Sequence, residues 1–185
     1  MNRSLRALAL ALTTLSTGAQ AGEVDLWGLL GNGNSTLSGG DVVYQLRDPA
    51  GITVNVALSF AEMTGGSSLQ LTAFKFNGAL TSQELRLFST NLIRLAQGCF
   101  NSDPARGASI TRWVLSNDAK EEHFYHTAGT RLAKASFGPL QMTLEKRVNG
   151  QAHSVSVQMT RRGVPGQAPW VNTCSFSALY RTSSG

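Results

Sequence analysis

Positions 52 to 60 alternate strictly between apolar and polar residues, which is typical of a β-strand with one buried and one wet face. The same alternation occurs over residues 42–46, and an Asp-Pro-Ala-Gly turn separates the two segments. Residues 69–76 predict a third strand, but the leucines at 69 and 71 lie on one side and the phenylalanines at 74 and 76 on the other. We expect a bulge, or coverage of both faces, where the apolar side changes.

The period of the pattern changes at Thr81. Thr81 and Glu84 have the spacing of a capping box, in which each side chain accepts a hydrogen bond from the other residue's backbone amide. The pattern then predicts an amphipathic helix over about 82–97, with Gly98 as its C-terminal stop. Its apolar stripe contains Leu85, Phe88, Leu92, Leu95 and Ala96.

The segment 108–127 has mixed signals. Ile110, Trp113 and Val114 have helical spacing, but residues 110–115 also read as a strand. Two further strands are predicted over 123–127 and 130–137, on either side of an Ala-Gly pair.

The dipeptide Asn149-Gly150 suits the two-residue loop of a type I′ hairpin. That loop would place Val148 opposite Gln151. The resulting hairpin has one apolar and one polar face, and a shift of one residue would destroy the match. The predicted apolar pairs are Leu140 with Met159, Met142 with Val157, and Leu144 with Val155.

A last strand carries Cys174, Phe176, Ala178 and Tyr180 on one side. Strands, one strong helix and further strands predict an α+β domain, in which an antiparallel sheet of about six to eight strands packs against one main amphipathic helix, about 82–97. We expect a single domain over 41–182, preceded by a Gly-rich flexible arm over 22–40.

The first 21 residues read as a secretory signal peptide. Arg3 and Arg6 form a basic region, residues 7–15 are apolar but too few to span a bilayer, and Ala19-Gln20-Ala21 fits a cleavage site. The mature chain should therefore be exported to the periplasm, the cell surface or the extracellular space, and it has no predicted transmembrane segment.

Export changes how the two cysteines are interpreted, because the compartment is expected to be oxidising. We predict a disulfide between Cys99 and Cys174, which would tie the end of the helix to the last strand. Closing a loop of about 75 residues contributes up to roughly 4 kcal/mol in the chain-entropy model.

The net charge of +5 conceals an asymmetry. From residue 104 to the C-terminus there are ten basic and four acidic residues. An anion-facing surface is one interpretation, and a solvated sheet face is the other. The partner would be an anionic envelope component or another exported protein, and nucleic acid stays open. The candidate surface residues are Arg131, Lys134, Lys146, Arg147, Arg161 and Arg162.

Chemical motifs are weak. Glu122, His123 and His126 are the best metal candidates, but histidines three apart point to opposite sides of a strand. His153 falls beside Lys146 on the apolar face of the hairpin, with no carboxylate partner evident in the sequence. We assign no catalytic residue and no cofactor.

The sequence therefore favours an exported, disulfide-stapled, non-enzymatic protein that binds or assembles at the cell envelope or outside the cell. The alternatives are a secreted metal-assisted hydrolase using the three metal candidates, and a carrier of a small apolar ligand, which would need a cavity.

Overall fold

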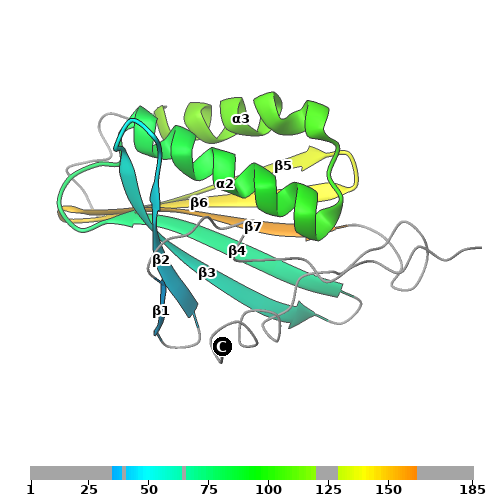
Figure 1. Ribbon diagram of the computed structural model, residues 1–185, viewed down its shortest axis with the longest axis horizontal. Coiled ribbons are helices and arrows are strands. Elements are labelled where there is room, and N and C mark those ends of the chain that lie inside the picture. The colour runs from blue at the N-terminus through cyan, green and yellow to red at the C-terminus, as the bar shows by residue number, and fades with distance from the viewer. Residues whose placement is uncertain (1–34, 39–40, 64–65, 120–128, 162–185) are drawn as a thin grey trace, which may run out of the picture.

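The computed structural model describes residues 35–38, 41–63, 66–119 and 129–161 (Figure 1). These segments form seven strands, two α-helices and one short 3-10 helix. In chain order they are β1 (Ser35–Ser38), β2 (Asp41–Arg47), β3 (Thr53–Met63), β4 (Gly66–Lys75), α2 (Ser82–Phe100), η1 (Pro104–Arg106), α3 (Gly107–Ala119), β5 (Gly129–Phe137), β6 (Leu140–Asn149) and β7 (Ala152–Arg161).

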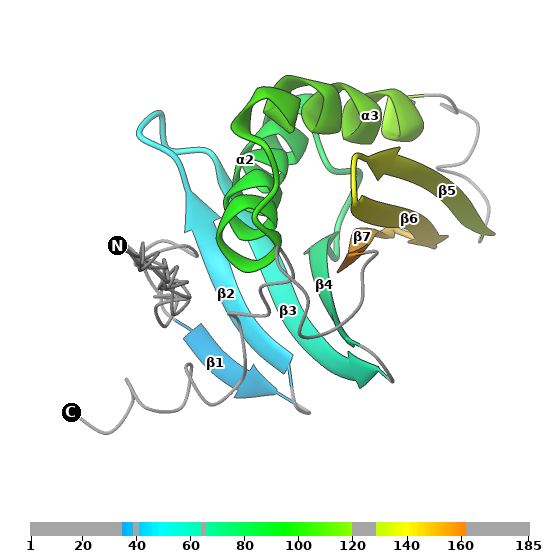
Figure 2. The same cartoon turned by 90° about the vertical axis from the view of Figure 1, so that its right-hand side faces the viewer.

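The strands form one antiparallel sheet in the order β1-β2-β3-β4-β7-β6-β5. Two meanders, one on each side of the helical segment in the sequence, meet where β4 pairs with β7. Both helices lie on one side of the sheet, with α2 over the first meander and α3 nearer to β5 and β6 (Figures 1 and 2). The predicted α+β class is confirmed.

The expectation of one main helix is corrected by α3, which packs against α2. Residues 107–119 are helical because Ile110 and Val114, one turn apart, are both buried and extend the core that α2 covers. The strand expected over 123–127 lies outside the described residues, as do the final strand with Cys174, the signal peptide and most of the arm. Residues Ser35–Ser38, expected within that arm, form β1 and pair with β2.

The core lies between the inward face of the sheet and the apolar stripe of α2. The alternation predicted for β2 and β3 is confirmed over residues 42–46 and 54–58, because every second, apolar side chain is buried and the side chains between them face the other way. Phe88 and Leu92 of α2 are completely buried against this face. The inward side chains of the central strands are Val54, Val56, Leu58, Leu69, Leu71, Ala73, Val155, Val157 and Met159.

Strand β4 has no bulge. Its pairing with β3 is continuous from Met63↔Gly66 to Asn55↔Phe74, and Ala73 extends the buried face of the two leucines. Phe74 therefore points away from the helices, and Phe76, beyond the strand, is 71% exposed. Their rings meet edge to face with centroids 5.5 Å apart. The expected change of face is wrong, because a small apolar residue continues the inward row.

Helix α2 begins as predicted and ends later. The Thr81 hydroxyl accepts a hydrogen bond from the Glu84 amide at 3.2 Å, and the Glu84 carboxylate accepts one from the Thr81 amide at 2.6 Å. Gly98 does not stop the helix, which continues to Phe100 and is capped by Asn101 in the left-handed conformation with φ 49°. Cys99 therefore lies inside the last turn.

Replacing Thr81 with alanine should lower the free energy of unfolding by about 1 kcal/mol, because the first turn loses its side-chain cap. Urea unfolding followed by circular dichroism measures the change. Thr90→Ala is the matched control, since Thr90 is exposed in the middle of the same helix and alanine is favourable there. Equal stability of Thr81→Ala and the unmodified protein would contradict the role of the cap.

The β6–β7 hairpin forms with a different register from the one predicted. Val148 pairs with His153 and Asn149 with Ala152, so Gly150 and Gln151 form the loop. Of these two, only Gly150 has a positive φ (59°), which fits a type II′ turn and not the type I′ turn expected. Every partner moves by two residues, and the apolar face survives because side chains alternate with a period of two. Met142, for example, faces Met159 instead of Val157.

Candidate functional site

Three ionisable side chains meet inside the described fold, and we refer to Asp118, Lys146 and His153 as the Asp118 cluster. Asp118 lies in the last turn of α3, Lys146 on β6 and His153 on β7. Their relative exposures are 7%, 2% and 2%. Buried ionisable groups are rare without partners, so their contacts decide what the cluster does.

Lys146 binds Asp118 in two ways. Its Nζ lies 3.0 Å from Oδ1 of the carboxylate and donates a hydrogen bond to the Asp118 backbone carbonyl at 2.8 Å. This carbonyl belongs to the C-terminal turn of α3, where helical carbonyls lack intrahelical donors and a positive charge is favourable. Lys146 therefore neutralises a buried carboxylate and caps a helix with the same ammonium group.

His153 is held at both ring nitrogens. The Leu80 amide donates a hydrogen bond to Nδ1 at 2.8 Å, so in the neutral imidazole the proton is on Nε2. Nε2 lies 3.4 Å from Oδ1 of Asp118, a distance that is long for a hydrogen bond and makes the attraction chiefly electrostatic. Because each nitrogen faces a protein group, neither is directed toward a substrate.

The charge state of Asp118 follows from these contacts. Burial alone would raise the pKa of its carboxyl, but the interactions with His153 and Lys146 outweigh that effect and hold the pKa below its ordinary value. Asp118 is therefore a carboxylate at neutral pH and forms an ion pair with the Lys146 ammonium.

The Asp118 cluster connects segments that are far apart in the chain. It joins the end of α3 to two adjacent strands and, through Leu80, to the residue just before the cap of α2. With its polar atoms directed at one another inside the core, the cluster fixes the position of the helices over the sheet and presents no reactive group to solvent.

A second polar contact crosses the two layers. The hydroxyl of Tyr44 on β2 donates to Oδ1 of Asn91 on α2 at 3.1 Å, and both residues are buried. Burial raises the pKa of Tyr44 far above its ordinary value, so the phenol stays neutral and acts as a hydrogen-bond donor.

The predicted anion-facing residues do not gather on one surface. The prediction is wrong for Lys146, which does not face solvent but is buried with Asp118. Arg131 pairs in register with Lys146 and therefore lies on the helix side of β5, whereas exposed Lys134 lies on the opposite face. Exposed Arg147 forms an ion pair with Glu145 on the same strand. Arg162 lies outside the described residues.

Arg161 interacts with the end of α2. Its Nη1 donates a hydrogen bond at 2.7 Å to the backbone carbonyl of Phe100, the last helical residue. The last turn of α2 has no basic residue of its own, so a strand supplies the favourable positive charge. This contact is a structural use of a residue that was expected to face an anionic partner.

Arg161→Gln should therefore lower the free energy of unfolding by about 1 to 2 kcal/mol, at the low end for charge-assisted hydrogen bonds because the side chain is only partly buried. Urea unfolding measures the change, with Arg147→Gln as a control that should stay within about 0.5 kcal/mol. If both variants unfold at the same urea concentration as the original protein, Arg161 does not stabilise the helix end.

The metal candidates Glu122, His123 and His126 lie outside the described residues, so that prediction stays open. Within the described ranges, no group of three His, Cys, Asp or Glu side chains could hold a metal ion. Cys99 is buried at 3% exposure in α2, and its predicted partner Cys174 lies beyond the described part, so the bridge stays a prediction. No described helix is long and apolar enough to cross a membrane.

Sequence reasoning identified Lys146 and His153 on an apolar face but missed Asp118. The signal was its spacing, since Ile110, Val114 and Asp118 recur every four residues and share one face of a helix. A carboxylate in line with a buried stripe, and two basic groups on a buried strand face, together indicate a buried ion pair. Because the sequence left this segment open between helix and strand, it did not predict that Asp118 shares a helix face with Ile110 and Val114.

The chain matches no protein-family model, no characterised protein and no solved structure.

Proposed function

We propose that the chain is an exported, non-enzymatic protein that binds or assembles at the cell envelope. The observation that carries the proposal is that the polar atoms of the Asp118 cluster are buried and contact one another. A general base needs a nitrogen or oxygen within reach of the substrate, and the nitrogens of His153 face Leu80 and Asp118 inside the core. The only buried ionisable cluster in the described segments thus supports a structural role.

The location of the remaining cations supports a binding role. Several arginines and lysines are exposed on both outer surfaces of the described fold, as in Arg86 on α2 and Lys134 on β5. Exposed charges contribute little to folding stability, so folding does not require these cations. Their positive charge can instead attract anionic partners. Export, which the N-terminal pattern predicts, would bring this surface to the envelope.

Cell fractionation tests export, and co-sedimentation tests binding. In the source cells the chain should be recovered outside the cytoplasm with an N-terminus near Gly22. The purified mature protein should sediment with washed envelopes at low salt and be released at about 1 M salt, where electrostatic attraction is screened within about 3 Å. An unprocessed cytoplasmic chain, or a mature chain that binds no envelope fraction at either salt, would overturn the proposal.

A further inference from the structure

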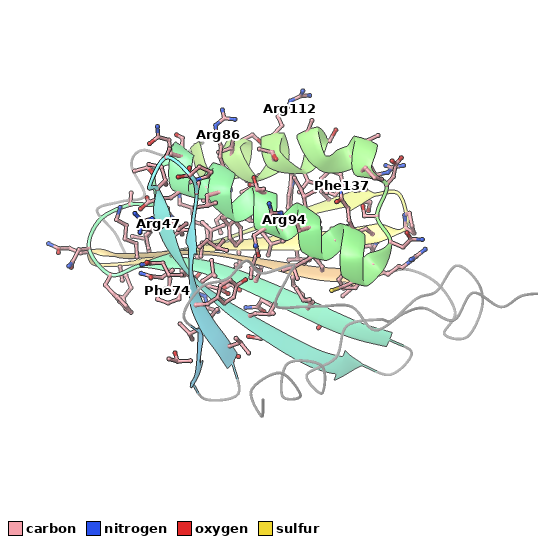
Figure 3. The ribbon with its side chains drawn as sticks, viewed as in Figure 1. Arg47, Phe74, Arg86, Arg94, Arg112 and Phe137 are labelled. Atoms are coloured by element: carbon pink, nitrogen blue, oxygen red, sulfur yellow. The ribbon has the colours of Figure 1, made fainter. Side chains whose placement is uncertain are left out.

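Three arginines project from the outer side of the helix layer, and we refer to Arg86, Arg94 and Arg112 as the helix-layer arginines. All three are exposed. Figure 3 shows Arg86 and Arg112 pointing away from the sheet. None belongs to the surface predicted from the sequence, which drew only on residues 131 to 162.

Their direction follows from helical geometry. Arg86 and Arg94 are eight residues apart and flank exposed Thr90, which places them about 12 Å apart along one stripe of α2, opposite the buried stripe. On α3, Arg112 lies on the side opposite buried Ile110 and Val114. The two helices contact each other on the same side of the sheet (Figure 2), so the three arginines belong to one layer.

Acidic groups of the helical segment are engaged elsewhere. Glu84 forms an ion pair with Lys75 at 2.9 Å, Asp103 caps the short 3-10 helix by accepting from Ala105, and Asp118 is buried with Lys146. Within residues 82–119, Asp103 is therefore the one exposed carboxylate, and the helix-layer arginines outnumber it three to one. Their positive charge is directed to solvent.

The side chains exposed on the helix layer favour binding to phosphate groups that are displayed on a flat surface. The exposed cations of the layer are arginines, whose planar fork matches phosphate oxygens in pairs. The large hydrophobic residues exposed in the described chain are Phe76 and Leu132, and neither belongs to a helix. The layer therefore offers no aromatic platform for stacked bases and no apolar wedge for insertion into a bilayer.

From these observations we propose that the helix layer adsorbs, through the helix-layer arginines, onto the phosphate headgroups of an anionic phospholipid membrane. The inference rests on the proposed envelope-binding function and names its partner and surface. Each arginine near such a membrane strengthens binding about fivefold, so three correspond to about a hundredfold. Because no side chain inserts, adsorption is reversible and depends on salt.

The test compares two triple variants of the mature chain. Arg86→Gln, Arg94→Gln and Arg112→Gln remove the helix-layer arginines. Arg47→Gln, Lys134→Gln and Arg147→Gln remove the same charge from exposed positions on the opposite sheet face. Sedimentation with phosphatidylglycerol vesicles and with phosphatidylcholine vesicles, at about 0.05 M and 1 M salt, measures partitioning.

We expect the unmodified protein to bind only the anionic vesicles and only at low salt. The helix-layer variant should bind about a hundredfold more weakly, while the sheet-face variant binds within a few fold of the original. Thermal unfolding should be unchanged for both, because the substituted residues are exposed.

Four results would overturn the inference. Equal weakening by both variants would mean that net charge alone controls binding, and weakening only by the sheet-face variant would assign the other surface. Failure to bind anionic vesicles while envelope fractions still retain the protein would reject phospholipid and preserve the proposed function, with an anionic polysaccharide or a protein as the partner. Failure to bind either would reject both proposals.

Discussion

Asp118→Ala should lower the free energy of unfolding by about 3 to 5 kcal/mol, because removing one partner of a buried ion pair leaves the other charge uncompensated. Lys146 would remain in the core without its carboxylate, and His153 would lose the group that faces Nε2. Urea unfolding at neutral pH measures the change.

A double-mutant cycle gives the control for this prediction. Asp118→Ala combined with Lys146→Met removes both charges, and it should be less destabilising than the sum of the two single changes, since the stranded ammonium is gone. A loss below about 1 kcal/mol for Asp118→Ala alone would show that the ion pair does not hold the helices on the sheet.

The same carboxylate makes stability depend on acid. The folded-state pKa of Asp118 is lowered relative to the ordinary value near 4, so its contribution is complete above that value and is lost as the pH falls through the folded pKa. The stability difference between the original protein and Asp118→Ala should therefore shrink as the pH falls below about 4. A difference that stays constant down to about pH 2 would contradict the ionised state assigned to Asp118.

Cys174→Ser should cost about 2 to 5 kcal/mol if the predicted bridge to Cys99 forms, the range found when a small secreted domain loses a native disulfide. Cys99 lies in the last turn of α2 and is 3% exposed, so a bridge there would fix the C-terminal segment of the chain to the helix layer. Thermal unfolding of the unreduced protein measures the change.

Two controls isolate the bridge from the cost of a polar hydroxyl in the core. Reduction of the original protein should lower its stability by a similar amount, whereas reduction of Cys174→Ser should change nothing. Titration of the unreduced, unfolded protein with Ellman's reagent should detect no free thiol. Two free thiols per chain would remove the disulfide and this prediction together.

Amphipathic patterns determined faces well and registers poorly. The apolar faces of β2, β3, β6 and β7 are the predicted ones, because each position has only two sides to choose between. The hairpin partners were displaced by two residues, a shift that moves no side chain to the other face. Only the backbone of the turn separates those registers, and Gly150 suits either turn type.

The two ends of α2 also differ in how well the sequence predicted them. The start of α2 depends on Thr81 and Glu84, three residues apart, and was predicted correctly. Its end is set by Asn101, which adopts the left-handed conformation expected of Gly98, while Arg161 of β7 binds the Phe100 carbonyl. Glycine and asparagine both suit that conformation, so the local pattern does not decide between positions 98 and 101.

By itself, the sequence determined the α+β class, the strand faces and the helix start, because each depends on residues a few positions apart. Tertiary structure alone decided which charges are buried and which are exposed. Asp118 and Lys146 are 28 residues apart and meet only when α3 lies over β6. That contact turned a predicted surface lysine into a core residue, and the outward stripes of α2 and α3 placed the helix-layer arginines among the exposed cations. The physical reason is that burial and pairing are properties of the folded whole, whereas periodicity and capping are properties of a short segment.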